Sequence, residues 1–280
     1  MNNTRLQMYK GRNLKFKNVF KNVFKYIDII LIKLSSIEIE GDEIYIQMMD
    51  SIVYLTNEIY WLIIGGFSEG AYARLRLLHE YIAKFTIIVN DEKEELLIKR
   101  YKLNNYIYEY RKMKNKEKIV FKYIKNYAIS NSLLSEFNYL MNCKYVDCNW
   151  WFEILLDNKK SKKKIGFSQL NDKFSEIQNK LAIDYDFKSN GNIIFEYTSE
   201  KVHMFSSKLD QFIRLLIVKK DIDEKLYLDD IINIIQLMTN ELAIFLYINF
   251  QQEKEIIDFV FKYQEKINFE IDKINEKYGC

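Results

Sequence analysis

The stretch from Phe67 to Asn90 reads FSEGAYARLRLLHEYIAKFTIIVN, and its pattern predicts the central helix of an all-helical protein. Ser68 is a favourable N-cap residue, and Glu69 follows in the first turn, where a negative charge suits the helix dipole. Apolar residues recur every three or four positions and form one stripe: Ala71, Leu75, Leu78, Ile82, Phe85 and Val89. A second apolar stripe runs beside it: Leu77, Tyr81 and Ile88. We therefore expect this helix to lie in the interior.

A charged pair interrupts the apolar surface of this helix. Arg76 and Glu80 lie four residues apart, and they share their face with small or apolar residues: Ala73, Ala83 and Ile87. Arg before Glu is the weaker order for an isolated helical ion pair, so stabilisation of the helix alone explains the pair poorly. An arginine in such surroundings needs a partner. The pair is either a structural ion pair or part of a functional site, and the pattern leaves both open.

The composition favours long helices joined by short polar turns. The chain has 280 residues, no proline and eight glycines, whereas proline averages about 5% of residues in globular proteins. The net charge of +3 is too small to indicate a nucleic-acid-binding surface over the whole chain. Lysine greatly outnumbers arginine, and Asn, Ile and Tyr are abundant, as a low-GC genome would produce. Arginine and histidine therefore carry more information here than lysine does.

The same features indicate a cytoplasmic protein without a membrane span. The three cysteines are few and odd in number, which suits a reducing compartment and provides no disulfide framework. The N-terminus is polar rather than typical of a signal peptide. The hydrophobic stretch at 226–250 carries Asp229, Asp230 and Glu241, so we expect a core helix there.

The chain divides into an N-terminal amphipathic helix at 1–40 and a single antiparallel helical bundle domain at 41–280. Helices are expected at 14–34, 43–64, 67–90, 92–113, 116–141, 168–181, 203–219, 226–250 and 252–277. Because the turn between the second and third of these is very short, that pair should pack antiparallel.

A connection at 142–166 has a different character from the rest of the chain. It contains Cys143, Cys148, the pair Trp150 and Trp151, and a dense lysine run that includes three consecutive residues: Lys162, Lys163 and Lys164. No second Cys or His pair accompanies the two cysteines, so a zinc site is not expected. The lysine run could contact phosphates of a nucleic acid, or it could form a solvated loop.

The stretch from Ile193 to Phe205, IIFEYTSEKVHMF, holds the second group of candidate residues. Ser199 can cap a new helix, and His203 follows one turn later on the same face. A helix N-terminus disfavours imidazolium, so His203 should tend toward the neutral form, which accepts a proton or binds a metal. A histidine hydrogen-bonded within the core is the alternative.

Two resemblances to known families follow from these residues. Arg74-x-x-x-x-His79 resembles the loose Arg-x(4–6)-His pattern of HEPN-type ribonucleases, although Leu75 replaces the polar residue that often follows the arginine. That resemblance implies a helical, metal-free ribonuclease in which a histidine moves the proton of the RNA 2′-hydroxyl and an arginine stabilises the phosphate.

A second resemblance, to an uncharacterised bacterial helical family known as unknown-function domain family 5677, covers roughly residues 45–250. It rests on Arg76-x-x-x-Glu80 in a leucine-rich helix, a tryptophan-containing loop, a short helix near 167–181, and Tyr197-x-Ser199-x-x-x-His203. The lysine-rich insertion after Trp151 departs from the family pattern. The resemblance implies one helical domain with one polar site, and it names no reaction.

The leading hypothesis is a metal-independent ribonuclease or nucleotide-targeting effector, of the kind found in bacterial defence or toxin systems. The candidate catalytic residues are Arg76, His79, Glu80, Ser199 and His203, and the candidate nucleic-acid contacts are Arg74, Lys162, Lys163 and Lys164. His203 or His79 would be the general base, Arg76 the phosphate clamp and Glu80 the residue that orients it. No cofactor is expected, and a dimetal site is disfavoured because only one Glu-x-x-His is present.

The competing hypothesis is a noncatalytic helical adaptor or sensor that binds a partner protein and whose polar cluster is structural. These two hypotheses name three kinds of partner: RNA or a nucleotide, a partner protein of a defence system, and a second copy of the chain.

Overall fold

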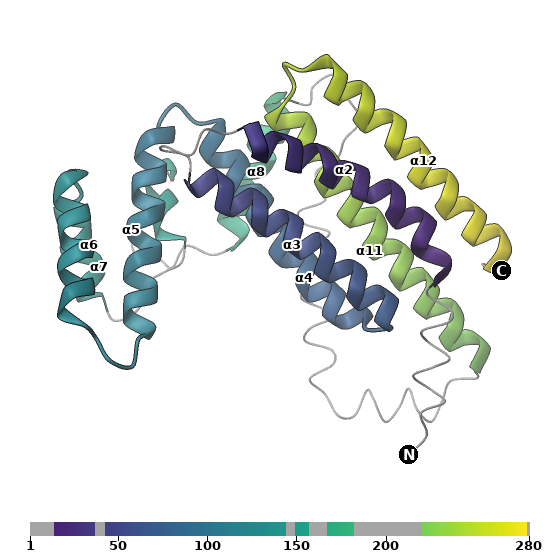
Figure 1. Ribbon diagram of the computed structural model, residues 1–280, viewed down its shortest axis with the longest axis horizontal. Coiled ribbons are helices and arrows are strands. Elements are labelled where there is room, and N and C mark those ends of the chain that lie inside the picture. Colours follow the sequence, from purple (N-terminus) through teal and green to yellow (C-terminus); the bar gives the residue numbers. More distant parts are fainter. Residues whose placement is uncertain (1–13, 37–42, 144–148, 157–166, 182–219, 279–280) are drawn as a thin grey trace. The chain divides into compact units, whose positions relative to one another are not determined.

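The computed structural model of the protein describes residues 14–36, 43–143, 149–156, 167–181 and 220–278 (Figure 1). Within these ranges every regular element is a helix, which confirms the predicted all-α class. The predicted helix at 203–219 lies outside them. The chain separates into two compact units, which are described one at a time: unit 1 comprises Met1–Thr86 with Gln178–Cys280, and unit 2 comprises Ile87–Ile177.

Most of the long helices belong to unit 1. Its elements are η1 (Leu14–Phe16), α2 (Lys17–Ser36), α3 (Glu43–Gly65), α4 (Ser68–Val89), α11 (Lys220–Asn249) and α12 (Lys254–Tyr278). Unit 2 contains α5 (Glu94–Lys112), α6 (Lys118–Ser130), α7 (Leu134–Asn142), η2 (Trp150–Leu155) and most of α8 (Phe167–Leu181). The last residues of α4 and of α8 pass the boundary between the units.

Helices α3 and α4 form an antiparallel hairpin around a tight turn. The rings of Tyr45 and Phe85, near the two open ends, lie 5.6 Å apart, and Glu58 pairs with Arg74 at 2.9 Å nearer the turn. Gly66, in the turn, has φ of 86°, a conformation that glycine adopts without the steric cost of a Cβ atom. The short connection at Gly66 therefore sets the direction of α4.

Helices α4 and α11 run in the same direction. Tyr72, near the start of α4, donates a hydrogen bond to the carbonyl of Asp230, in the first half of α11, at 3.2 Å. Further along both helices, the rings of Phe85 and Phe245 lie 5.1 Å apart. Contacts that advance together along two helices require parallel axes, so the antiparallel arrangement does not extend to this pair.

Helix α2 belongs to the core of unit 1 and packs antiparallel to α12. The Tyr26 hydroxyl donates to the carbonyl of Val260 at 3.0 Å, while Lys33, seven residues further on, pairs with Glu253, seven residues earlier. Burial raises the pKa of Tyr26 above its usual value. The same helix packs on α3 through an aromatic group: Phe20, Phe24 and Tyr60.

The segment Leu228–Asn249 of α11 is long and apolar enough, by length and composition, to cross a membrane, with a mean hydropathy of 1.6. However, 83% of its most apolar window is buried inside the protein. The core helix of a globular protein passes the same test, and the contacts of α11 with α4 and α12 are of that kind.

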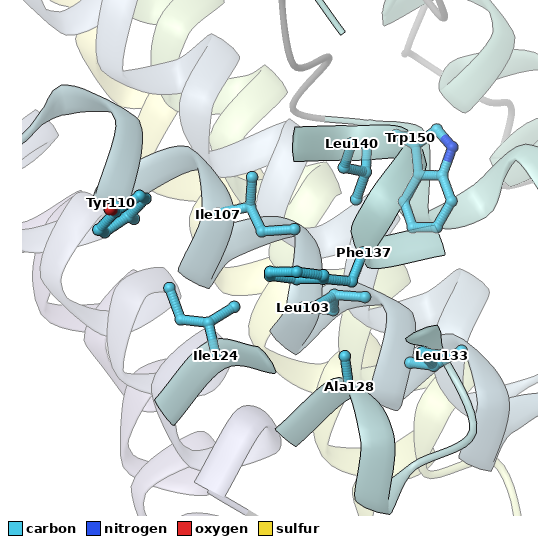
Figure 2. Close-up of a cluster of buried hydrophobic side chains, with 9 residues drawn as sticks. All are labelled: Leu103, Ile107, Tyr110, Ile124, Ala128, Leu133, Phe137, Leu140 and Trp150. Carbon is cyan, nitrogen blue, oxygen red and sulfur yellow. The ribbon is translucent and has the colours of Figure 1, made fainter. Parts of the chain in front are cut away.

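The core of unit 2 lies between α5, α6 and α7. Figure 2 shows Ile124 and Ala128 of α6 directed toward Phe137 of α7. The buried members of this cluster are Leu103, Ile107, Tyr110, Ile124, Ala128, Leu133, Phe137, Leu140 and Trp150. Because α6 presents only one side to this core, its other side remains exposed.

The single helix predicted at 116–141 is in fact two helices. The Leu133 N–H donates to the Ala128 carbonyl at 2.7 Å and closes α6, and Ser132 adopts a positive φ of 59°. A positive φ is uncommon for a residue with a Cβ atom and marks a turn. The polar sequence Ser-Asn-Ser at 130–132 is the signal for this break.

Arg100 of α5 orders the tryptophan segment. Its Nε donates to the Trp151 carbonyl at 3.1 Å, and its guanidinium carbon lies 3.9 Å from the centre of the Trp150 ring. Glu136 and Glu153 each lie 3.6 Å from one of its terminal nitrogens. Burial lowers the pKa of Arg100, and the two carboxylates oppose that shift. A buried cation with these partners fixes η2 against α5.

Candidate functional site

Three alternating charges lie along the surface of α4. The Nε atom of Arg76 is 3.6 Å from one carboxylate oxygen of Glu80, and the ammonium of Lys84 is 4.0 Å from the other. We call these three residues the α4 charge row. Two cations share one carboxylate, so the row carries a net positive charge. The side chains are 32%, 23% and 13% exposed in that order, so water reaches the Arg76 end most easily.

This geometry decides what the Arg76–Glu80 pair can do. At 3.6 Å in a partly exposed site, the attraction is weak, because solvent screens it and the separation is longer than a hydrogen bond. A guanidinium held loosely by a carboxylate can exchange that partner for a phosphate, which it binds through two parallel N–H donors. The α4 charge row is therefore suited to an anionic ligand.

The second candidate group on α4, Arg74 and His79, is divided between two environments. Arg74 pairs with Glu58 of α3 at 2.9 Å, and its side chain is 41% exposed. His79 is fully buried. Five residues along a helix also turn a side chain through about 140°. The two members of the Arg-x(4)-His pattern therefore have different partners and different access to solvent.

His79 forms a buried pair with Glu241 of α11. Its Nδ1 lies 2.8 Å from a carboxylate oxygen of Glu241, and neither side chain has any exposed surface. An ionised carboxylate only accepts hydrogen bonds, so Nδ1 carries the proton in that form of the pair. The pair joins the two parallel helices in the interior of unit 1, and in this position the ring cannot touch a substrate.

The structure thus brings some predicted residues together and separates others. Arg76 and Glu80 share the α4 charge row, whereas His79 lies in the interior with Glu241. The remaining candidates lie outside the described residues: Ser199, His203, Lys162, Lys163 and Lys164. The convergence of Arg76 with His203 therefore stays a prediction.

Two residues of these groups were not predicted from the sequence: Lys84 of the α4 charge row and Glu241 of the buried pair. The signal for Lys84 was its spacing, because it follows Glu80 at the same four-residue interval that separates Glu80 from Arg76. For Glu241 the signal was a carboxylate in an otherwise apolar stretch, which requires a buried partner. No pattern identified His79 as that partner, since the contact joins residues 162 positions apart.

Across the part of the chain that the structure describes, no group of three or more His, Cys, Asp or Glu side chains could hold a metal ion. Cys143 is a free thiol in the same part of the chain.

The fold and the site define an all-α protein in which helix α4 carries both a partly exposed cationic row and the histidine of a buried histidine–carboxylate pair. The family described as "Family of unknown function (DUF5677)" matches residues 42–225, well over half of the chain. The protein belongs to this family, as its motifs predicted. No curated protein and no solved structure matches the chain.

Proposed function

We propose that this protein is a metal-independent ribonuclease, or a related effector that targets nucleotides, and that Arg76 is its phosphate-binding residue. The observation that carries the proposal is the α4 charge row, in which two cations share one carboxylate at a partly exposed position. Two cations beside one carboxylate favour the approach of an anion. Glu80 orients the guanidinium, and Lys84 adds to the positive potential.

The reaction we propose is transesterification within RNA. The 2′-oxygen attacks the adjacent phosphorus while the bond from phosphorus to the 5′-oxygen breaks. A general base takes the proton of the 2′-hydroxyl, and the leaving 5′-oxygen receives a proton from solvent or from the protonated base. The products are a 2′,3′-cyclic phosphate and a 5′-hydroxyl end. Arg76 stabilises the charge that develops on the phosphate oxygens.

The burial of His79 makes His203 the stronger candidate for the general base, because a base must come within hydrogen-bond reach of the proton it removes. Ser199, one turn before His203 in the sequence, is proposed to line the same site. Arg74 and the lysines at 162–164 are proposed to contact RNA outside the reaction centre. His79 then acts through Glu241 by holding α4 in position.

A role in bacterial defence or in a toxin system rests on analogy with helical ribonuclease toxins. A cytoplasmic location fits such a role, since the RNA is there. Both remain proposals that the cleavage experiment addresses first.

Cleavage of total RNA in the presence of EDTA tests the proposal. Wild-type protein is expected to release fragments with 2′,3′-cyclic phosphate ends, and His203→Ala is expected to lower the rate by about a hundredfold or more. Single-stranded DNA should resist cleavage under the same conditions, because it lacks the 2′-hydroxyl. Equal, background-level cleavage by wild type and His203→Ala would end the proposal.

A noncatalytic adaptor is the second candidate, and one observation favours it. Helix α3 and the turn that follows it expose three large aromatic side chains, Tyr54, Trp61 and Phe67, at 62%, 66% and 57%. Exposed aromatic residues are common in protein interfaces. On this view the protein binds a partner or a second copy of itself, no RNA is cut, and the charged pairs serve stability alone.

A further inference from the structure

A second cationic surface lies on the exposed side of α6, in unit 2. It consists of three lysines with one apolar and one aromatic neighbour, and we call it the α6 outer face: Lys118, Lys122, Lys125, Ile119 and Tyr123. All five are exposed, Ile119 by 74% and Tyr123 by 59%. The opposite side of the helix packs into the core of unit 2 through Ile124 and Ala128 (Figure 2).

The spacing places the lysines in one line. Lys118, Lys122 and Lys125 are separated by four and three residues, so they follow one another along the same side of the helix. Ile119 and Tyr123 are four residues apart and form a second line beside the lysines. The Tyr123 ring also packs edge-on against Tyr106 of α5, with ring centres 5.9 Å apart, which limits its rotation.

Acidic residues are scarce in the sequence around this face. Helix α6 contains neither Asp nor Glu, and residues 112–125 include six lysines against one glutamate. Some exposed lysines elsewhere in the described chain pair with a carboxylate one helical turn away, as Lys25 does with Asp28 and Lys273 with Glu270. Among the described residues, no ion pair engages any lysine of the α6 outer face.

Helix α12 provides an internal comparison, because the tetrapeptide Val-Phe-Lys-Tyr occurs at 120–123 in α6 and again at 260–263 in α12. In α12 the lysine of this tetrapeptide, Lys262, has Asp258 four residues before it and Glu265 three residues after it.

The corresponding positions around Lys122 in α6 are Lys118 and Lys125. Helix α12 is also rich in lysine but keeps acidic neighbours beside Lys262, so the lack of acidic residues distinguishes α6 from this helix. Like charges one turn apart destabilise a helix, and a bound polyanion reduces the repulsion between them.

We propose that the α6 outer face binds the phosphate backbone of single-stranded RNA, with a base stacked on Tyr123. A line of cations beside an exposed aromatic ring is the combination that proteins use for single strands without sequence preference. The choice of RNA as the ligand rests on the function proposed above. The line of lysines and the exposed ring are observations that do not depend on that function. An acidic protein segment and an anionic membrane surface are the competing occupants.

Binding of a fluorescein-labelled 2′-O-methyl oligouridylate tests the proposal. This probe lacks a free 2′-hydroxyl, so it cannot undergo the proposed cleavage, and binding is measured whether or not the protein is a ribonuclease. The variant K118Q/K122Q/K125Q keeps good helix formers at exposed positions, so it should fold normally, as its thermal midpoint will show. The control variant K262Q/K266Q/K273Q removes the same charge from α12.

The α6 variant is expected to raise Kd by about tenfold or more at low salt and to reduce the slope of log Kd against log salt by about 2, since each phosphate contact in a single strand contributes about 0.7. The α12 variant should change Kd less than about twofold. Tyr123→Ala should weaken binding and leave the slope unchanged, because a stacked ring releases no counterions.

Three results would overturn the assignment: no binding by wild type, equal weakening by both lysine variants, or binding of polyglutamate or phosphatidylserine vesicles in place of the oligonucleotide. If the wild type binds the probe but does not cleave RNA, the proposed ribonuclease activity is overturned. The assignment of the α6 outer face as an RNA-binding surface is then unaffected.

Discussion

Replacing His79 by alanine is expected to lower the free energy of unfolding by about 3–5 kcal/mol. The substitution leaves the Glu241 carboxylate buried beside an empty space, with the partner at 2.8 Å gone. An unpaired buried charge is among the few causes of losses this large. Urea denaturation followed by far-UV circular dichroism measures the effect, and Lys25→Gln, which removes an exposed ion pair in the same unit, should cost less than about 1 kcal/mol.

A double variant separates the charge from the cavity. His79→Leu with Glu241→Leu replaces both polar groups by apolar side chains, and such replacements of buried pairs are often neutral or stabilising. The double variant should therefore recover most of the stability that His79→Ala loses. If His79→Ala alone costs less than about 1 kcal/mol, the pair is not the structural tie between α4 and α11 that its burial indicates.

Replacing Arg100 by alanine is expected to lower the free energy of unfolding by about 2–4 kcal/mol. The Trp151 carbonyl loses its donor, the Trp150 ring loses the cation above it, and two carboxylates lose their shared partner. The loss should be smaller than a fully buried pair would give, because Glu136 and Glu153 are each about a quarter exposed and regain water.

Tryptophan fluorescence reports this change directly. The chain has three tryptophans, and Trp61→Phe removes the exposed one, so the remaining signal comes from Trp150 and Trp151. In that background Arg100→Ala should shift the emission to longer wavelength as η2 loosens. Arg100→Lys keeps the charge but lacks the planar stack and the Nε donor, so it should recover only part of the stability. Full recovery by lysine would mean that charge alone, and not the geometry of the guanidinium, holds η2.

The local rules of helix formation predicted most of the described fold. The expected helix at 43–64 is observed at Glu43–Gly65, and the stretch at 67–90 forms a helix at Ser68–Val89 whose first stripe is buried from Ala71 to Phe85. These predictions depend on residues three and four apart, which a sequence displays directly. The break between α6 and α7 was missed because the apolar pattern continues through it. The helix ends there because Ser132 adopts a positive φ, which the pattern does not show.

The candidate site was predictable only where its members are neighbours in sequence. Arg76 and Glu80 share a face because they lie on one helix, and Lys84 extends the same interval. The partners of His79 and Arg100 come from elements far along the chain, and which helices meet depends on packing that no local pattern encodes. The parallel packing of α4 on α11 was not predictable for the same reason. The two helices are far apart in the sequence, so no short turn between them sets their relative direction.

Parallel measurement of RNA cleavage and of unfolding for Arg76→Gln tests most directly whether the α4 charge row is functional. The cleavage rate of this variant in EDTA is expected to fall by about a hundredfold, as when an enzyme loses one group that stabilises transition-state charge. The free energy of unfolding should change by less than about 1 kcal/mol, because the Arg76–Glu80 pair is partly exposed and loosely held. A loss of several kcal/mol in stability, with no RNA cleavage by the wild type, would instead identify the row as a structural element of a noncatalytic protein.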